Sequence, residues 1–421
     1  MAQSLVEQVM TAERALGERM IESALVIVRS WMNELGDKNQ YEDAHASISK
    51  QYNDLFSLWL TSDDQEIDEL LNSLTGEAYQ LVDAVYADLR LKRGLSPDMH
   101  GFNQESPLSI MNYFLNCVRM RPEDLEWVRK VMNDSNETVN ALMAVTALSM
   151  NLRECFNIDA FLLLIEGMNA ENKIVATQCI GSTLTLLIHY DIRIDYFRQI
   201  QDAFVEAVQE FGDGGIRVLN ILCSLVDLSA RRIQPDAEHH TQQVTSLDDL
   251  PKALQTLIDE VEDVREHMQE ENEDAEPEAL IQWYPASESD YMKGLFEILP
   301  DTWVFDLLTA DNPEFEKTVA SVCLKCGYRD FLWLHPDVAE KVFREKLRKK
   351  SKDPMDYINY AHCLLLKGDR MMAVENYRQA RSLCKNVKDF YNLFRPDRAA
   401  LAEKGVPLEH VYMIEDQLFQ A

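Results

Sequence analysis

The stretch from Tyr357 to Ala380 constrains the fold more than any other part of the chain. It contains two helical patterns separated by the turn-forming pair Gly368 and Asp369. Small, aromatic and apolar residues recur at helical spacing on both sides of that turn. These packing positions are Tyr357, Ala361, Leu364, Gly368, Ala373, Tyr377 and Ala380. Neither helix can bury its apolar face alone, so the pattern predicts a helix-turn-helix pair that stacks on further helices.

This pattern resembles the tetratricopeptide repeat (TPR) family, clearly over residues 354–387 and in degenerate form over about 320–421. A shift of one repeat toward the N-terminus places Gly327, Ala339 and Phe343 at packing positions. The resemblance implies a helical-hairpin stack that binds other proteins and carries no chemistry by itself.

In the TPR family the first helix of each repeat usually lines a concave groove. The resemblance therefore implies a partner-binding groove formed by Met355, Ile358, Asn359, His362, Leu365 and Leu366. Because this set is mostly apolar and the chain is acidic, we expect a protein partner that presents an apolar helix or extended peptide with basic flanks. The same face could instead bury against a second copy of the chain, so self-association stays open.

Four regions are expected along the chain. Residues 1–95 show helical periodicity and predict an N-terminal helical bundle. Residues 96–234 weakly resemble HEAT or TPR-like hairpins, because two similar segments, Asn157–Phe161 and Arg193–Phe197, each lie between apolar helices. An acidic helix and linker at 235–295 precedes a TPR-like C-terminal domain at 296–421. The whole predicts an all-α, helical-repeat protein of α-solenoid-like architecture.

The charge is strongly biased, with 41 Lys and Arg against 72 Asp and Glu and a formal net charge of −31. This weighs against nucleic-acid binding, because a phosphate backbone would be repelled. Residues 259–278 contribute eleven acids against one arginine, whereas residues 341–352 hold seven basic residues and one acid. The plain interpretation is that these cations complement a helix dipole. The alternative is that they bind acidic groups, including the run at 259–278.

Membrane insertion is not expected, because no apolar run of about 18 residues is present. The N-terminal residues show no basic leader followed by an apolar block, which predicts a cytoplasmic protein. The eight cysteines lie mostly in apolar helical patterns, which is typical of reduced, buried thiols.

Cys323 and Cys326 form a CxxC motif, which as half of a zinc site would need two further ligands. The nearby candidates are His335 and His362, and core packing of the cysteines is the favoured interpretation. No nucleophile elbow, kinase signature or phosphate loop occurs. We predict a non-enzymatic protein-protein interaction scaffold or adaptor without a cofactor. The alternatives are a regulatory or metal-dependent enzyme near the CxxC motif and a structural homo-oligomer.

Overall fold

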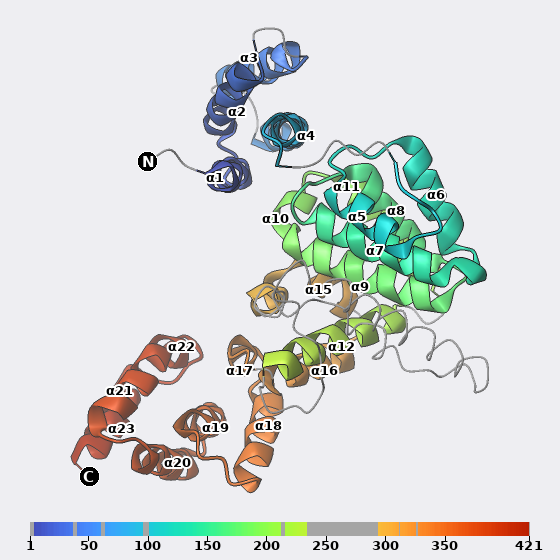
Figure 1. Cartoon of the computed structure of the whole chain (residues 1–421). Helices are drawn as coiled ribbons and strands as arrows, with labels where there is room; N and C mark the ends of the chain where they lie inside the picture. Colours follow the sequence, from blue (N-terminus) through green and yellow to red (C-terminus); the bar gives the residue numbers. More distant parts are fainter. Residues whose placement is uncertain are drawn as a thin grey trace. The chain divides into compact units, whose positions relative to one another are not determined.

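The computed structural model of the chain describes residues 4–36, 40–59, 64–95, 101–211, 215–233, 294–310, 312–325 and 327–420. Throughout these ranges the regular secondary structure is helical, so the predicted all-α fold is confirmed (Figure 1). The chain divides into two compact units. The described part of unit 1 ends at Ile221, and that of unit 2 comprises 222–233 and 294–420. Of the predicted acidic helix and linker at 235–295, residues 235–293 lie outside the described residues. Cys326 also lies outside them.

Unit 1 begins with four amphipathic helices. They are α1 (Leu5–Gly17), α2 (Ile21–Leu35), α3 (Glu42–Trp59) and α4 (Asp64–Lys92). A capping box starts the first of them, since the Ser4 hydroxyl accepts a hydrogen bond from the Glu7 amide and the Glu7 carboxylate accepts one from the Ser4 amide. The long α4 contacts the other three helices, which places their apolar faces in one core.

The remainder of unit 1 is built around two helices that are buried on nearly all sides, α7 and α9. The helices are α5 (Pro107–Asn116), α6 (Pro122–Met132), α7 (Thr138–Leu152), α8 (Ile158–Glu166), α9 (Lys173–His189), α10 (Asp191–Ile194), α11 (Arg198–Gln209) and the first part of α12 (Ile216–Ile233). Packing is tight at Gly167, where a Cβ atom would lie 2.5 Å from the sulfur of Cys179. Only glycine fits such an approach.

The similarity between Asn157–Phe161 and Arg193–Phe197 does not correspond to one repeated local structure. Asn157 is the N-cap of α8, and its side chain accepts a hydrogen bond from the Ala160 amide. Arg193, by contrast, lies within the short helix α10, and Phe197 is the residue before α11. The two segments therefore resemble each other in sequence but occupy different positions relative to their helices.

Unit 2 consists of short helices joined by tight turns. They are α15 (Trp303–Thr309), α16 (Pro313–Lys325), α17 (Asp330–Leu334), α18 (Pro336–Arg348), α19 (Pro354–Leu366), α20 (Arg370–Leu383), α21 (Val387–Phe394), α22 (Arg398–Glu403) and α23 (Leu408–Gln420). Proline at the first position starts α16, α18 and α19, where its missing N–H has no cost. Gly368 has a φ of 85°, which lets the chain reverse between α19 and α20.

The α19–α20 hairpin matches the predicted helix pair, and the helices that follow pack against it. Helices α21 and α22 are joined through a 3-10 turn (Arg395–Asp397) into one helical run, after which α23 begins. Of the predicted packing residues, Ala361, Ala373, Tyr377 and Ala380 are fully buried, Leu364 is buried and Tyr357 is partly buried; Gly368 lies in the turn.

The preceding, degenerate repeat departs from the expected register. Ala339 and Phe343 are buried in α18 as expected. Gly327, expected at a packing position within a helix, instead has a φ of 90° and lies in the turn after α16. The chain turns there because α16 ends at Lys325 and the short helix α17 is inserted before α18.

Candidate functional site

The six residues of the predicted groove lie on α19, and most of them face the interior of unit 2. Ile358 and His362 are fully buried, Asn359 and Leu365 are buried, and Met355 and Leu366 are partly buried. A partner could contact the four buried side chains only if unit 2 opened locally.

His362 is the centre of a buried hydrogen-bond network that joins several helices. Its Nδ1 lies 2.6 Å from the hydroxyl of Tyr377 on α20, and its Nε2 lies 3.1 Å from Oδ2 of Asp397. One neutral tautomer satisfies both contacts: the Nε2–H donates to Asp397, and Nδ1 accepts from the Tyr377 hydroxyl. Arg329, before α17, forms an ion pair with Asp397 and donates to Asn359 at 3.3 Å.

Burial and hydrogen bonding set the protonation states in this network. Burial lowers the pKa of His362, with Asp397 opposing the shift. Burial by itself would raise the pKa of Asp397, but the hydrogen bond from His362 and the charge of Arg329 outweigh it and lower that pKa. Burial also raises the pKa of Tyr377. Near neutral pH the imidazole is therefore neutral, the carboxylate ionised and the phenol protonated.

The order Tyr–His–Asp resembles an acid–base relay, but its position in the fold argues for a structural role. The His362 and Tyr377 side chains have no exposed surface, and aromatic rings of Trp333 and Phe394 cover the imidazole at centroid distances of 5.5 and 5.6 Å. A substrate has no route to the imidazole in this arrangement. The network fastens α17, α19, α20 and the 3-10 turn before α22 to one another.

The described residues of the predicted metal alternative, which leave out Cys326, are also engaged or buried. Cys323 is fully buried in α16. The Nε2 atom of His335 lies 3.2 Å from a carboxylate oxygen of Glu316, and His362 belongs to the network above. Among the residues that the structure describes, no group of three or more His, Cys, Asp or Glu side chains is arranged to hold a metal ion.

Six exposed apolar side chains that the sequence did not single out lie on α20 and α23, two helices that contact each other. We call this set the outer apolar face. It comprises Met371 (80% exposed), Met372 (46%) and Leu383 (38%) on α20, with Leu408 (43%), Tyr412 (52%) and Met413 (65%) on α23. The signal in the sequence was the Met371–Met372 pair, since neither residue takes a packing position of the hairpin.

Unit 1 contains a second buried network, centred on Arg193. The guanidinium forms ion pairs with Asp83 of α4 and Glu13 of α1, and its central carbon lies 3.7 Å from the centroid of the Phe156 ring. Burial raises the pKa of Asp83 to about 6, although Arg193 opposes the shift, and burial likewise raises the pKa of Glu13. The network connects the first four helices to the remainder of unit 1.

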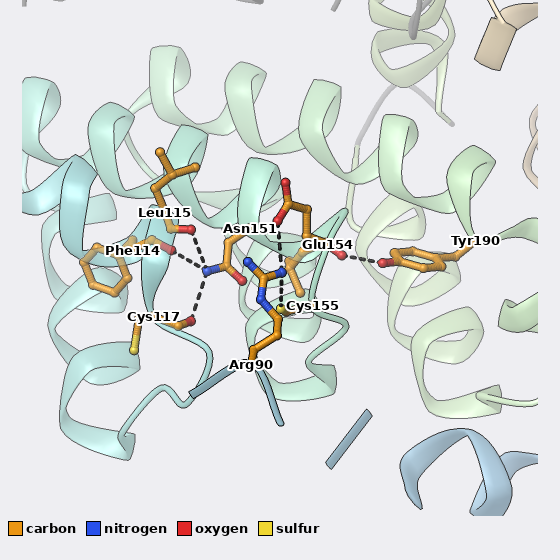
Figure 2. A network of polar contacts seen from close by, with 9 residues as sticks. Arg90, Phe114, Leu115, Cys117, Asn151, Glu154, Cys155 and Tyr190 are labelled. Carbon is orange, nitrogen blue, oxygen red and sulfur yellow. Dashed lines mark hydrogen bonds and ion pairs between the residues drawn. The ribbon is translucent and has the colours of Figure 1, made fainter. Parts of the chain in front are cut away.

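Figure 2 shows a further structural network in unit 1, in which Asn151 closes the end of α5. Its side-chain amide donates to the carbonyl oxygens of Phe114, Leu115 and Cys117 at 2.9, 3.0 and 3.0 Å. The carbonyls of Phe114 and Leu115 lie in the last turn of α5, where the helix supplies no amide partner, so the asparagine supplies one. Nearby, Arg90 of α4 forms an ion pair with Glu154 at 3.0 Å, again joining the two parts of unit 1.

Comparison of the chain with known proteins gives no match. The chain matches no protein-family profile, no curated protein and no solved structure. None of the helices in the described part of the chain is both long and apolar enough to cross a membrane. A functional proposal therefore depends on the surfaces and networks of the chain itself.

Proposed function

We propose that this chain is a non-enzymatic scaffold or adaptor that binds another protein through the hairpin stack of unit 2. The observation that carries the proposal is the outer apolar face. Burying a large apolar side chain against a partner stabilises a complex by about 1.5–3 kcal/mol, and this face offers several such side chains on two neighbouring helices.

The arrangement of polar groups supports a binding role. Three polar residues of unit 2 have side chains suited to acid–base chemistry: His362, Tyr377 and Asp397. They are buried, and their hydrogen bonds to one another join helices. The outer surface is left free for contact, as in repeat proteins, where packing residues hold the stack and surface residues select the partner. The TPR resemblance of the α19–α20 hairpin supports the same proposal.

A displayed peptide library tests it without knowledge of the partner. The full chain is used for selection, and enriched peptides are retested against Met371→Gln/Met413→Gln and against the control Met10→Gln/Val26→Gln. The control changes two residues of unit 1 with comparable exposure, 57% and 64%. Circular dichroism checks that all three proteins have equal helicity.

The proposal expects enriched peptides that bind the control as well as the unmodified chain and bind the Met371/Met413 variant at least tenfold more weakly. No enrichment, or equal binding by both variants, would refute it. A concentration-dependent mass that the Met371/Met413 variant abolishes would instead favour the homo-oligomer.

A further inference from the structure

Unit 2 carries an excess of cations at one end of its hairpins. Helices α18 and α19 pack against each other, as do α19 and α20, and a short turn joins each pair. The turn after α20 lies close to the turn between α18 and α19, because the charge of Asp353, the N-cap of α19, acts on the thiol of Cys384 at the C-cap of α20. Burial raises the pKa of that thiol, Asp389 and Asp353 raise it further, and Arg381 lowers it.

We call this region the cationic end and define it by six residues: Arg348, Lys350, Lys352, Arg381, Lys385 and Lys388. Arg381 is partly buried and the other five are exposed. Within the described residues none of the six forms an ion pair. Two neighbouring lysines differ, because Lys346 pairs with Asp356 at 3.3 Å and Lys349 with Glu345 at 3.5 Å.

Helix dipoles do not account for these cations. A cation stabilises a helix within its last turn, and only Arg348 and Arg381 lie in the last turns of α18 and α20. Lys352 and Lys385 come after those helices have ended. Lys388 lies in the first turn of α21, where the dipole disfavours a positive charge. The excess therefore has no explanation in helix stability.

The negative charge of the protein lies mainly elsewhere. Residues 294–421 hold nineteen Lys and Arg against twenty Asp and Glu, whereas the whole chain holds 41 against 72. The net charge of −31 on the whole chain repels a long polyanion such as a nucleic acid, and an anionic membrane likewise. A short acidic protein segment needs to contact the cationic end alone.

We propose that the cationic end binds a short acidic segment of a partner protein. The proposal rests on the proposed function and names the chemistry of the partner. Carboxylates of the segment pair with Arg381, Lys385 and Lys388, while an apolar side chain contacts Leu383, which is exposed between them in sequence. Because single exposed ion pairs are weak, several act together and binding weakens as salt is added.

The test uses a short fluorescein-labelled peptide rich in Asp and Glu with one central leucine, titrated with the full chain at low ionic strength. Its matched control peptide carries Asn and Gln in place of the acids. The test variant is Lys385→Glu/Lys388→Glu. The control variant, Arg370→Glu/Lys404→Glu, makes the same change in net charge at exposed positions outside the cationic end. Arg370 is the first residue of α20, and Lys404 follows the last residue of α22.

The expected result is saturable binding of the acidic peptide, roughly tenfold weaker for the Lys385/Lys388 variant and unchanged for the control variant. The amide peptide should not bind. Absence of binding, or equal weakening in both variants, would overturn the proposal. So would tighter binding of single-stranded DNA or phosphatidylserine vesicles with the same dependence on Lys385 and Lys388, since the partner would then be of another class.

Two further results separate this inference from its alternatives. If neutralising the acids of residues 259–278 strengthens peptide binding tenfold or more, the cationic end is occupied by the chain's own acidic run and the proposed partner is wrong. If library selection yields peptides that depend on Met371 while the acidic peptide does not bind, the scaffold function stands and the acidic partner is refuted. If neither binds, both proposals fail.

Discussion

The two buried networks, one in each unit, both join helices, but one buries a charged group and the other a neutral one. In unit 1 a charged guanidinium, Arg193, is buried against two carboxylates and aromatic rings. In unit 2 a neutral imidazole, His362, is buried between a phenol and a carboxylate. Both join helices that are distant in sequence. The difference is that unit 1 must keep charges paired, whereas unit 2 must keep one group uncharged.

This contrast predicts that the largest effect comes from removing the buried charge. Arg193→Leu leaves Asp83 and Glu13 without their cation. Breaking a fully buried pair on one side typically costs about 3–5 kcal/mol, and the lower end applies here because these carboxylate side chains are 20% and 38% exposed. The free energy of unfolding of unit 1 is measured by hydrogen exchange in urea, which reports the units separately. The control is Arg198→Leu, whose pair with Asp202 is exposed and should cost less than about 1 kcal/mol. Equal costs would show that the Arg193 network is not needed.

A smaller loss is expected from the neutral network. Tyr377→Phe keeps the buried ring but leaves Nδ1 of His362 without its donor, which should cost unit 2 about 1–3 kcal/mol. The same exchange experiment follows peptides of α19 and α20. Tyr412→Phe removes a hydroxyl from a residue that is 52% exposed and should change stability little. A Tyr377→Phe protein as stable as this control would contradict the proposed hydrogen bond.

The two networks should also respond to acid in opposite directions. Folded unit 2 binds a proton at His362 less readily than the unfolded chain, whose histidine has an ordinary pKa of 6.5. Its contribution is therefore present above that pKa and lost as the pH falls below it. Burial lowers the pKa of His335 too, so His362→Gln should reduce the loss between pH 7 and 5 without abolishing it. An unchanged pH slope would contradict the burial of a neutral imidazole.

Asp83 should act with the other sign in unit 1. Its pKa is about 6 when folded, against an ordinary 3.8, so folded unit 1 takes up this proton more readily and gains stability as the pH falls from 7 to 4. His189 opposes this gain, because burial lowers its pKa to about 4. The informative quantity is thus the difference between Asp83→Asn and the unmodified chain, and the variant should lose more stability on acidification. A shallower loss would refute the assignment.

The smallest effect on stability is expected at the surface. Lys385→Glu/Lys388→Glu changes two exposed cations that have no ion pair in the described part of the chain. The free energy of unfolding of unit 2 should change by less than about 1 kcal/mol in hydrogen exchange, far less than for Tyr377→Phe. A larger loss would mean that these lysines stabilise the stack, and their role in binding would then have no support.

Local patterns predicted the fold well where the physics is local. The Gly368 turn and the small residues Ala361 and Ala373 follow from helix packing between sequence neighbours, and the structure places them as expected. The networks were not predictable in this way. Asp83 and Arg193 are 110 residues apart, and Asp397 lies beyond the end of the clear repeat. Their pairing depends on how the helices meet in space.

The surface was harder to predict than the core. Helical spacing identifies the faces of α19 but not which of them neighbouring helices cover, so His362 was placed in a groove although Tyr377, Trp333 and Phe394 enclose it. Total charge was a poor guide for a similar reason. It predicts a partner with basic flanks, which stays a prediction, and it does not reveal the cations of unit 2 that motivate the proposal of an acidic segment, because the acids of the chain are unevenly distributed.

The buried network of unit 2 is expected to hold its helices together, while the surface binds the partner. The most direct test measures the dissociation constant of the acidic peptide for Tyr377→Phe and for Lys385→Glu/Lys388→Glu, under conditions where hydrogen exchange shows both proteins folded. Tyr377→Phe should bind like the unmodified chain, and the lysine variant should bind roughly tenfold more weakly. Weaker binding by folded Tyr377→Phe, with no change in the lysine variant, would contradict this expectation.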